Sequence, residues 1–271
     1  MYKITLPEAG PKRLYFEVHI KYVHNILTFL GLPCTLSGKT DDNAFVLQVN
    51  ETPILIDFSN FLPLVRDPAK YPFYFKFQYC SSTHQKFSNV FSFTKVSFQF
   101  WERFYQLSDK IKYSGESNVI LNMQLVHQGA RERRDFVQKM LKAKYGSGVV
   151  TNVVLDQVEY WNRINNCLVH VFVPGARNDI LDRGHIQYLA FGCCTIAPPI
   201  VDELSFNQKL IPGKHYVCCK PDYSDLIDKI EWCKRNRKKC RIIGANAKKL
   251  FWETSVPEKM WEWVRKCTGI E

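Results

Sequence analysis

The sequence lacks the short motifs that identify several large classes of enzyme. It contains no G-x-G-x-x-G fingerprint of dinucleotide-binding oxidoreductases, no G-x-x-x-x-G-K-[ST] loop of NTPases and no G-x-S-x-G turn of serine hydrolases. The H-E-x-x-H pair of zinc peptidases is also missing. These absences weaken all four assignments. Any phosphate group that the chain binds is therefore expected to be held by side chains.

Long apolar runs are missing as well. The longest stretch without a charged residue spans residues 184–201, and it contains His185, Gln187 and two prolines, which a membrane-spanning helix disfavours. The first fifteen residues carry four charged side chains and no apolar core, so they do not resemble a secretory signal. We therefore expect no transmembrane segment and a cytoplasmic location.

The ten cysteines include no C-x-x-C pair. Four of them form the vicinal pairs 193–194 and 218–219, inside apolar, strand-like runs. Free cysteine is among the most buried residue types, and thiols stay reduced in the cytosol. We expect buried thiols, with no disulfide framework and no metal site.

The sequence does contain enough apolar residues for a packed core, and an excess of positive charge. Its 271 residues are 46% hydrophobic, and 37 Lys and Arg against 26 Asp and Glu give 37 − 26 = +11. A single core tends to split beyond about 250 residues, so two lobes with a cleft are expected. The charge predicts an anionic partner, which could be a nucleic acid, a membrane surface or a phosphorylated small molecule.

Strand-like and helix-like segments alternate through most of the chain, which predicts an α/β fold with parallel, doubly wound sheets. We place a first lobe at residues 1–112 and a second lobe at residues 113–252. A C-terminal helix at residues 253–271 is expected to pack back on the first lobe. The alternating aromatic residues of 73–79 predict a strand with one buried face, rather than a surface on which nucleic-acid bases stack.

The first candidate binding loop follows a predicted strand and opens a predicted helix. It contains Gly129, Arg131, Arg133 and Arg134. Backbone N–H groups at a helix start and guanidinium groups both suit a diphosphate. The alternative is a solvated basic face of the helix, and the sequence leaves the two interpretations open.

The second candidate loop, residues 173–187, is also flanked by a strand and a helix start. Arg177, Asp179, Asp182 and Arg183 gather in it, where a nucleotide sugar would need polar contacts. Asp182 is equally suited to be only the N-cap of the helix that follows.

A basic segment spans residues 229–249. It holds nine Lys and Arg side chains, opposed only by Glu231. The simpler interpretation is a surface helix with one buried stripe, and binding of a polyanion is the alternative.

Several stretches resemble one group of glycosyltransferases. The similarity to the C-terminal part of the lipopolysaccharide-modifying and protein O-glucosyl- or O-xylosyltransferase family is carried by residues 210–217, 220–226, 230–232, 236 and 243–247. Residues 89–94 and 183–195 also resemble this family and the related exostosin-type transferases, including the exostosin-like xylosyltransferases of chlorella viruses. The resemblance implies a compact GT-B fold, with the donor held by the second lobe, the acceptor by the first, and no metal required.

The resemblance implies an inverting glycosyltransferase, without a cofactor, that moves xylose or glucose from a UDP-sugar to a glycan hydroxyl. A strand in the first lobe of such enzymes ends in the catalytic Asp, which places the general base at Asp57; His19, His24 and His84 are the alternatives. Arg133 and Arg183, supported by Arg131 or Arg134, would face the diphosphate. Gln187 stands where many related enzymes carry the Glu that holds the ribose. A non-enzymatic polyanion-binding protein and a Rossmann-type methyltransferase are the competing classes.

Overall fold

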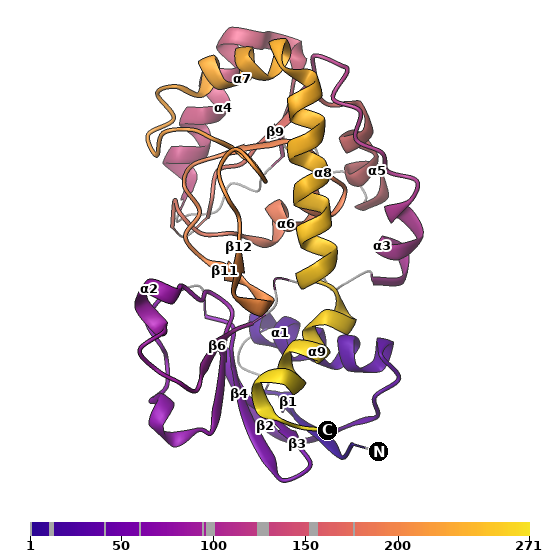
Figure 1. The fold of residues 1–271 in the computed structure, drawn as a ribbon, viewed down its shortest axis with the longest axis vertical. Coiled ribbons are helices and arrows are strands. Elements are labelled where there is room, and N and C mark those ends of the chain that lie inside the picture. The colour runs from indigo at the N-terminus through magenta and orange to yellow at the C-terminus, as the bar shows by residue number, and fades with distance from the viewer. Residues whose placement is uncertain are drawn as a thin grey trace. The chain divides into compact units, whose positions relative to one another are not determined.

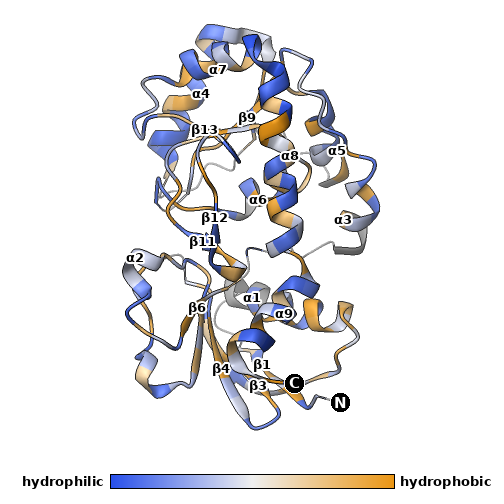
Figure 2. Ribbon diagram, in the orientation of Figure 1, coloured by the Kyte–Doolittle hydropathy of each residue, from blue (hydrophilic) through white to orange (hydrophobic). Residues whose placement is uncertain are grey.

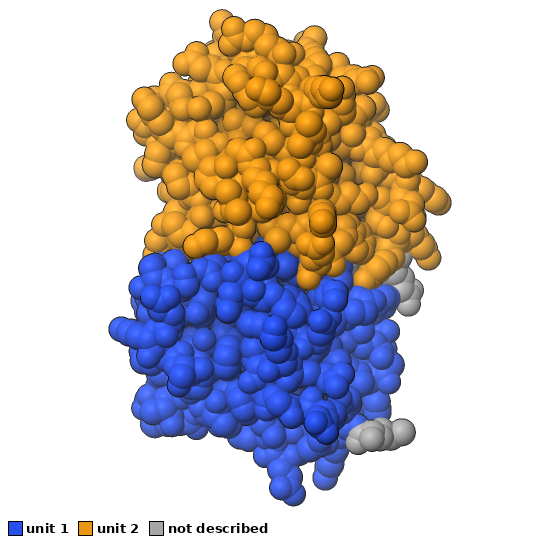
Figure 3. Space-filling view, viewed as in Figure 1, with its two compact units in different colours: residues 1–101, 202–208, 254–271 blue, residues 102–201, 209–253 orange. Residues whose placement is uncertain are grey.

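A computed structural model describes residues 2–10, 14–40, 42–59, 61–93, 95, 101–123, 130–151, 157–175 and 177–271, apart from the side chains of 14–18, 101–103, 157 and 183. The chain divides into two compact units (Figure 3). Unit 1 comprises residues 1–101, 202–208 and 254–271, and unit 2 comprises residues 102–201 and 209–253. The first division between the units therefore falls between residues 101 and 102.

Unit 1 is built on a six-stranded sheet with the strand order β2-β1-β3-β4-β5-β6. The strands are β1 (Ile4–Ala9), β2 (Cys34–Thr40), β3 (Ala44–Val49), β4 (Thr52–Asp57), β5 (Phe73–Lys76) and β6 (Val90–Ser92). The sheet is mixed, because β3 runs antiparallel to both β1 and β4, while the other pairs are parallel. It therefore departs from the fully parallel sheet that we expected.

The two longer helices of unit 1, α1 (Leu14–Phe29) and α9 (Pro257–Thr268), come from opposite ends of the chain. The unit also contains α2 (Ser81–His84) and the short 3-10 helices η1 (Pro68–Lys70) and η5 (Ser205–Asn207). In α9 the indole of Trp263 donates a hydrogen bond to the carbonyl oxygen of Ser92 over 2.8 Å. The C-terminal helix is thus fixed to the end of β6.

Unit 2 contains a five-stranded, wholly parallel sheet with the order β13-β10-β9-β7-β8. The strands are β7 (Ile120–Asn122), β8 (Val149–Thr151), β9 (Val169–Val171), β10 (Thr195–Ala197) and β13 (Val217–Cys218). Every residue of β7, β9 and β10 is buried, as expected for parallel strands covered on both faces. When the five strands are numbered 1 to 5 along the chain and read from β8 to β13, their order in the sheet is 2-1-3-4-5. This order is a doubly wound topology.

The helices of unit 2 alternate with these strands (Figure 1). They are α3 (Trp101–Ser108), α4 (Arg131–Tyr145), α5 (Gln157–Asn162), α6 (Arg183–Ala190), α7 (Leu226–Arg235) and α8 (Arg237–Thr254), with two short 3-10 turns, η3 (Gly146–Gly148) and η4 (Arg163–Asn166). Figure 2 shows hydrophilic and hydrophobic residues interleaved along α8. That pattern fits the surface helix with one buried stripe that the basic segment predicted. A small two-stranded sheet, β11 (Glu203–Leu204) with β12 (Gln208–Lys209), completes the fold.

The α/β class predicted from the sequence is confirmed, and one strand differs from its prediction. In β5, Tyr74, Phe75 and Lys76 are all buried, so both faces of the strand are covered. The single buried face predicted from the aromatic alternation is wrong, because consecutive side chains of a strand point to opposite faces of the sheet and three consecutive side chains of β5 are buried.

Two further expectations can be compared with the described residues. All ten cysteines are free, and seven of them are buried. None of the helices in the described ranges is both long and apolar enough to cross a lipid bilayer.

Candidate functional site

The order of strands in unit 2 reverses between β7 and β9. Open α/β sheets bind ligands outside the carboxyl ends of the strands at such a switch point. Asn122, the last residue of β7, donates from Nδ2 to the carbonyl oxygen of Val171, the last residue of β9, over 3.0 Å. This bond ties the two strand ends together, and both candidate loops of the sequence start here.

Helix α4 starts after the loop that follows β7 and sends two arginines to the loop that follows β9. Arg134 donates from Nε to the carbonyl oxygen of Val173 over 3.1 Å and forms an ion pair with Asp182 at 3.2 Å. Arg133 donates to the carbonyl oxygens of Pro174 and Gly175 at 3.0 and 2.8 Å. The two loops that the sequence offered as separate candidates therefore form one cluster.

The two arginines of this cluster are not equally engaged. The Arg134 side chain is only 7% exposed, and burial lowers the pKa of its guanidinium, an effect that the Asp182 carboxylate opposes. Arg133 is less buried, and its Nε has no hydrogen-bond partner in the part of the chain that the structure describes. An unsatisfied buried donor costs free energy, so the hydrogen-bonding capacity of Arg133 is not fully used by the described residues.

Asp182 is the N-cap of α6, as the sequence allowed. Its Oδ1 accepts a hydrogen bond from the backbone N–H of His185 at 3.2 Å, while Oδ2 pairs with Arg134. One carboxylate thus caps the helix and links α4 to α6. The side chain of Arg183, the next residue, lies outside the description, as does the whole of Gly129.

The remaining predicted donor-binding residues have other partners. Arg177 and Asp179 pair with each other through two hydrogen bonds of 2.8 and 2.6 Å. Arg131 is 72% exposed and lies 4.0 Å from Asp135 on the same helix. Gln187 accepts a hydrogen bond from the indole N–H of Trp161 at 2.6 Å. None of these four contacts joins the cluster of Arg133, Arg134 and Asp182.

Tyr223 belongs near this cluster, although the sequence gave no reason to select it. Its backbone φ is 60°, which is an outlier for a bulky residue, and its side chain is 1% exposed. The hydroxyl donates to Asn178 Oδ1 over 2.9 Å. Burial raises the pKa of Tyr223, and the nearby Arg133 and Arg134 act in the opposite direction, so the ring lies within electrostatic reach of both arginines.

A pair of buried histidines lies along β9 and α6. The ring of His170 stacks on Tyr188 with centroids 3.5 Å apart, and His185 lies 6.2 Å from His170. No described group forms a hydrogen bond to either imidazole ring. Burial lowers the pKa of His185 to about 3, and burial together with His185 lowers the pKa of His170 well below 6.5. Both rings are therefore neutral at physiological pH.

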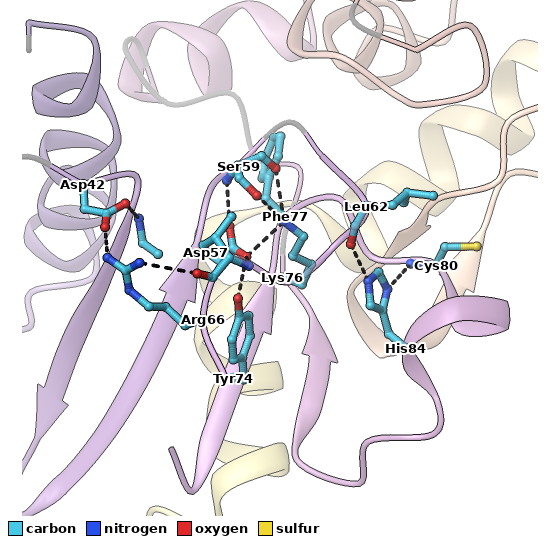
Figure 4. A network of polar contacts seen from close by, with 12 residues as sticks. Asp42, Asp57, Ser59, Leu62, Arg66, Tyr74, Lys76, Phe77, Cys80 and His84 are labelled. Carbon is cyan, nitrogen blue, oxygen red and sulfur yellow. Dashed lines mark hydrogen bonds and ion pairs between the residues drawn. The ribbon is translucent and has the colours of Figure 1, made fainter. Parts of the chain in front are cut away.

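Asp57, the predicted base, lies in a closed network of unit 1 (Figure 4). The Tyr74 hydroxyl donates to its Oδ2 over 2.6 Å, and the Lys76 ammonium approaches the same oxygen at 3.0 Å. The backbone N–H of Ser59 donates to Oδ1 over 2.8 Å. The Asp57 and Lys76 side chains are both 0% exposed.

The register of the sheet explains this network. Asp57 and Lys76 are direct partners in the parallel pair of β4 and β5, so both side chains leave the sheet on the same face. Burial lowers the pKa of Lys76, which the Asp57 carboxylate opposes, and burial followed by Asp57 raises the pKa of Tyr74. The network holds two strand ends and the start of the next loop together.

Two of the three alternative bases in unit 1 are also committed to other contacts. His84 accepts the Cys80 backbone N–H at Nδ1 over 2.9 Å, so its Nε2 carries the proton and donates to the carbonyl oxygen of Leu62 at 2.7 Å. Burial lowers the pKa of His84. His19 is buried and stacks on Phe58 with centroids 4.7 Å apart. His24 lies partly exposed on α1.

The basic segment forms α7 and α8, and several of its side chains have structural partners. Arg237 donates to the carbonyl oxygens of Gly115, Glu116 and Ser117 at 2.6 to 2.8 Å. A cleft of about 650 Å³ borders the same helices and β13. Charges of both signs line it, from Asp225, Asp228, Lys229, Arg235 and Lys239, together with Trp232 and Ile242. This mixture of charges does not favour a polyanion.

Comparison with known proteins finds relatives over short stretches only. No family model matches the chain. The uncharacterized protein 179R of Invertebrate iridescent virus 6 is 39% identical over 70 residues, which is 23% of this chain and 6% of that protein. The uncharacterized protein 035R of Invertebrate iridescent virus 3 is 44% identical over 49 residues, 18% of this chain and 4% of that protein. The matched part of the chain thus covers only a small share of the length of these curated viral relatives.

Proposed function

We propose that the chain is an inverting glycosyltransferase of the GT-B type that takes its sugar from a UDP-sugar. The observation that carries the proposal is the meeting of Arg133, Arg134 and the N-terminus of α6 at the switch point of the parallel sheet in unit 2. Such a position is where doubly wound sheets bind nucleotides. The resemblance of residues 210–247 to glycosyltransferases supports the same class, and a viral origin agrees with the short similarities to viral proteins.

The cluster suits a diphosphate leaving group. When an acceptor hydroxyl attacks the anomeric carbon, the bond from that carbon to the UDP oxygen breaks and negative charge grows on the diphosphate. Guanidinium groups and helix N–H groups stabilise such charge most strongly in a site from which water is excluded. In this proposal Arg133 contacts the phosphates directly, and Arg134 holds Asp182 and α6 in position.

The acceptor hydroxyl must also lose its proton, and Asp57 remains our prediction for the base. Its carboxylate is sealed in the described geometry by Tyr74, Lys76 and Ser59. A role as base therefore requires the loop after β4 to open and Lys76 to leave the carboxylate. Without that movement Asp57 is an anchor of the fold.

Nucleotide binding provides the test of this function. The purified chain is screened by thermal shift and for slow sugar release with UDP-xylose, UDP-glucose, other nucleotide sugars, UDP alone and S-adenosylmethionine. We expect UDP and at least one UDP-sugar to raise the melting temperature, since a ligand at 100 times its Kd stabilises the folded state by about 2.7 kcal/mol. Stabilisation by S-adenosylmethionine, with none by UDP, would instead favour a methyltransferase.

A further inference from the structure

Three cysteine thiols meet in the core of unit 2. Cys194 lies just before β10, Cys233 lies in α7 and Cys240 lies in α8. Their Sγ atoms all lie within 4.8 Å of one another, and all three residues are 0% exposed. Two consecutive helices and the start of a strand about 40 residues earlier thus bring one soft ligand atom each to the same point.

Local backbone features create this meeting. Helix α7 ends at Arg235 with Asn236 as its C-cap, and α8 starts directly after it, which lets the Cys240 thiol approach the carbonyl oxygen of Cys233 to 3.7 Å. Gly244 follows Cys240 by one turn of α8 and lies against the backbone of Gly192. A Cβ at Gly244 would overlap the carbonyl oxygen of Gly192, and it would also come within 3.2 Å of the Cys194 nitrogen. The glycine therefore allows α8 to approach the segment just before β10, which contains Cys194.

The spacing of the thiols fits a metal ion. Zinc–thiolate bonds are about 2.3 Å long, which places the sulfur atoms of three ligands around one ion about 3.8 to 4.0 Å apart. A set of sulfur atoms within 4.8 Å of one another needs only small rotations to reach that geometry. Soft thiolate ligands select Cu(I) and Zn(II) over hard ions such as Mg²⁺.

The surroundings also suit the negative charge that three thiolates would bring. Arg237 lies one turn before Cys240 on α8, and Arg241 follows Cys240 directly. Both guanidinium groups are held by carbonyl oxygens of the loop at residues 114–117. These two cations offset part of the charge of a thiolate-bound ion.

We propose that Cys194, Cys233 and Cys240 bind one thiophilic metal ion, Zn(II) or Cu(I), which ties α7 and α8 to β10. Binding forms three metal–sulfur bonds, and the thiol protons pass to solvent without any oxidation or reduction. The role is structural and independent of the proposed transferase activity. The alternative is that the three thiols are only small apolar side chains of the core.

The test uses the purified full chain, reduced and freed of metal under anaerobic conditions. It is titrated with Zn(II) in one arm and with a Cu(I) complex in the other, against a competing chelator, and the bound metal is counted by mass spectrometry. We expect one ion per chain and a higher melting temperature in at least one arm. The stronger arm identifies the ion.

Single Cys→Ala variants test whether metal binding depends on the three proposed ligands and not on the other thiols. Cys194→Ala, Cys233→Ala and Cys240→Ala should each weaken binding at least about 100-fold, because even an outer partner that only orients a ligand is worth 10- to 100-fold. Cys167→Ala is the matched control, since Cys167 is equally buried in unit 2 but outside the cluster. Equal loss in the control, or no loss in the three variants, would overturn the proposal.

A measurement on the unaltered chain covers the case in which a variant fails to fold. X-ray absorption at the edge of the bound metal should report three sulfur ligands at about 2.3 Å. A shell of oxygen or nitrogen, or a chain that binds neither ion with one-to-one saturation, would overturn the proposal.

Discussion

The two units each contain a cluster of charged side chains, and the clusters differ in how completely their partners are used. In unit 1, Asp57 and Lys76 are 0% exposed, and the carboxylate accepts hydrogen bonds at both oxygens. In unit 2, the Asp182 side chain is 29% exposed, and the buried Nε of Arg133 has no partner among the described residues. The first cluster is closed on itself, and the second has spare hydrogen-bonding capacity.

Because of this difference, we expect the cluster of unit 1 to contribute mainly to stability and the cluster of unit 2 mainly to ligand binding. A closed buried ion pair has little left to offer a ligand, but removal of one partner leaves the other charge buried and uncompensated. A partly open cluster contributes less to stability and can accept a ligand with little rearrangement. We therefore expect substitutions in unit 1 to act mainly on folding and substitutions at Arg133 to act mainly on nucleotide binding.

The largest effect on stability should come from Lys76→Met. The substitution removes the ammonium group that pairs with the buried Asp57 carboxyl, and the loss of one partner of a buried pair typically costs about 3 to 5 kcal/mol. The free energy of unfolding, measured in urea, is expected to fall by that amount. The double variant Asp57→Asn, Lys76→Met should recover part of the loss.

Lys39→Met is the control for that experiment, because Lys39 is an exposed lysine of β2 in the same unit. It should change the free energy of unfolding by less than about 0.5 kcal/mol. Equal effects of the two lysine substitutions would show that the buried network does not stabilise unit 1.

Asp57→Asn tests whether Asp57, which lies in the closed network of unit 1, is also the general base of the proposed sugar transfer. If Asp57 takes the acceptor's proton, sugar transfer should fall at least about 1,000-fold while the Kd for UDP is unchanged. The double variant with Lys76→Met, which regains stability, should remain inactive. Transfer at a near-normal rate in the single variant would assign Asp57 to the fold alone.

The buried histidines of unit 2 should make the free energy of unfolding fall as the pH is lowered. The unfolded chain protonates His185 near pH 6.5, whereas the folded chain resists protonation down to about pH 3, so the folded state loses stability as the pH falls through this window. For this one group the loss between pH 7 and pH 5 is about 2 kcal/mol. Urea unfolding at the two pH values should show a correspondingly smaller loss in His185→Leu. An identical loss in that variant would contradict the assignment.

The smallest effect is expected for Arg131→Ala. Its side chain is exposed and lies 4.0 Å from Asp135, and surface ion pairs of this kind contribute about 0 to 1 kcal/mol. Melting temperature and UDP affinity should both stay close to those of the unaltered chain. A large loss of UDP affinity would move the binding surface from the loop after β9 to the outer face of α4.

The helices were the part of the fold that the sequence predicted best. Apolar periodicity in the sequence predicts helices at residues 224–236, 240–252 and 257–267, and the structure has α7, α8 and α9 there. Periodicity identifies such segments because it is a local property. By residue type Ser224 is a plausible N-cap for the first of these helices, whereas Asp225 occupies that position in α7.

Contacts between distant segments were harder to predict. Lys76 stands inside an aromatic strand, and that unusual charge was the available signal for a buried partner, but only the register of β4 with β5 identifies the partner as Asp57. The cysteines were predicted to be buried thiols without a C-x-x-C pair. Their spacing along the chain gives no indication that residues 194, 233 and 240 converge, because that depends on how α7 and α8 pack on the sheet.

The most direct test of the central claim is a calorimetric titration of UDP into the unaltered chain, Arg133→Ala and Arg131→Ala. We predict saturable binding by the unaltered chain and by Arg131→Ala. Arg133→Ala should remain folded and bind about 10- to 100-fold more weakly, since a hydrogen bond to a charged group contributes about 1.5 to 3 kcal/mol. An unaltered chain that does not bind UDP, or an Arg133→Ala variant that binds it normally, would contradict the account.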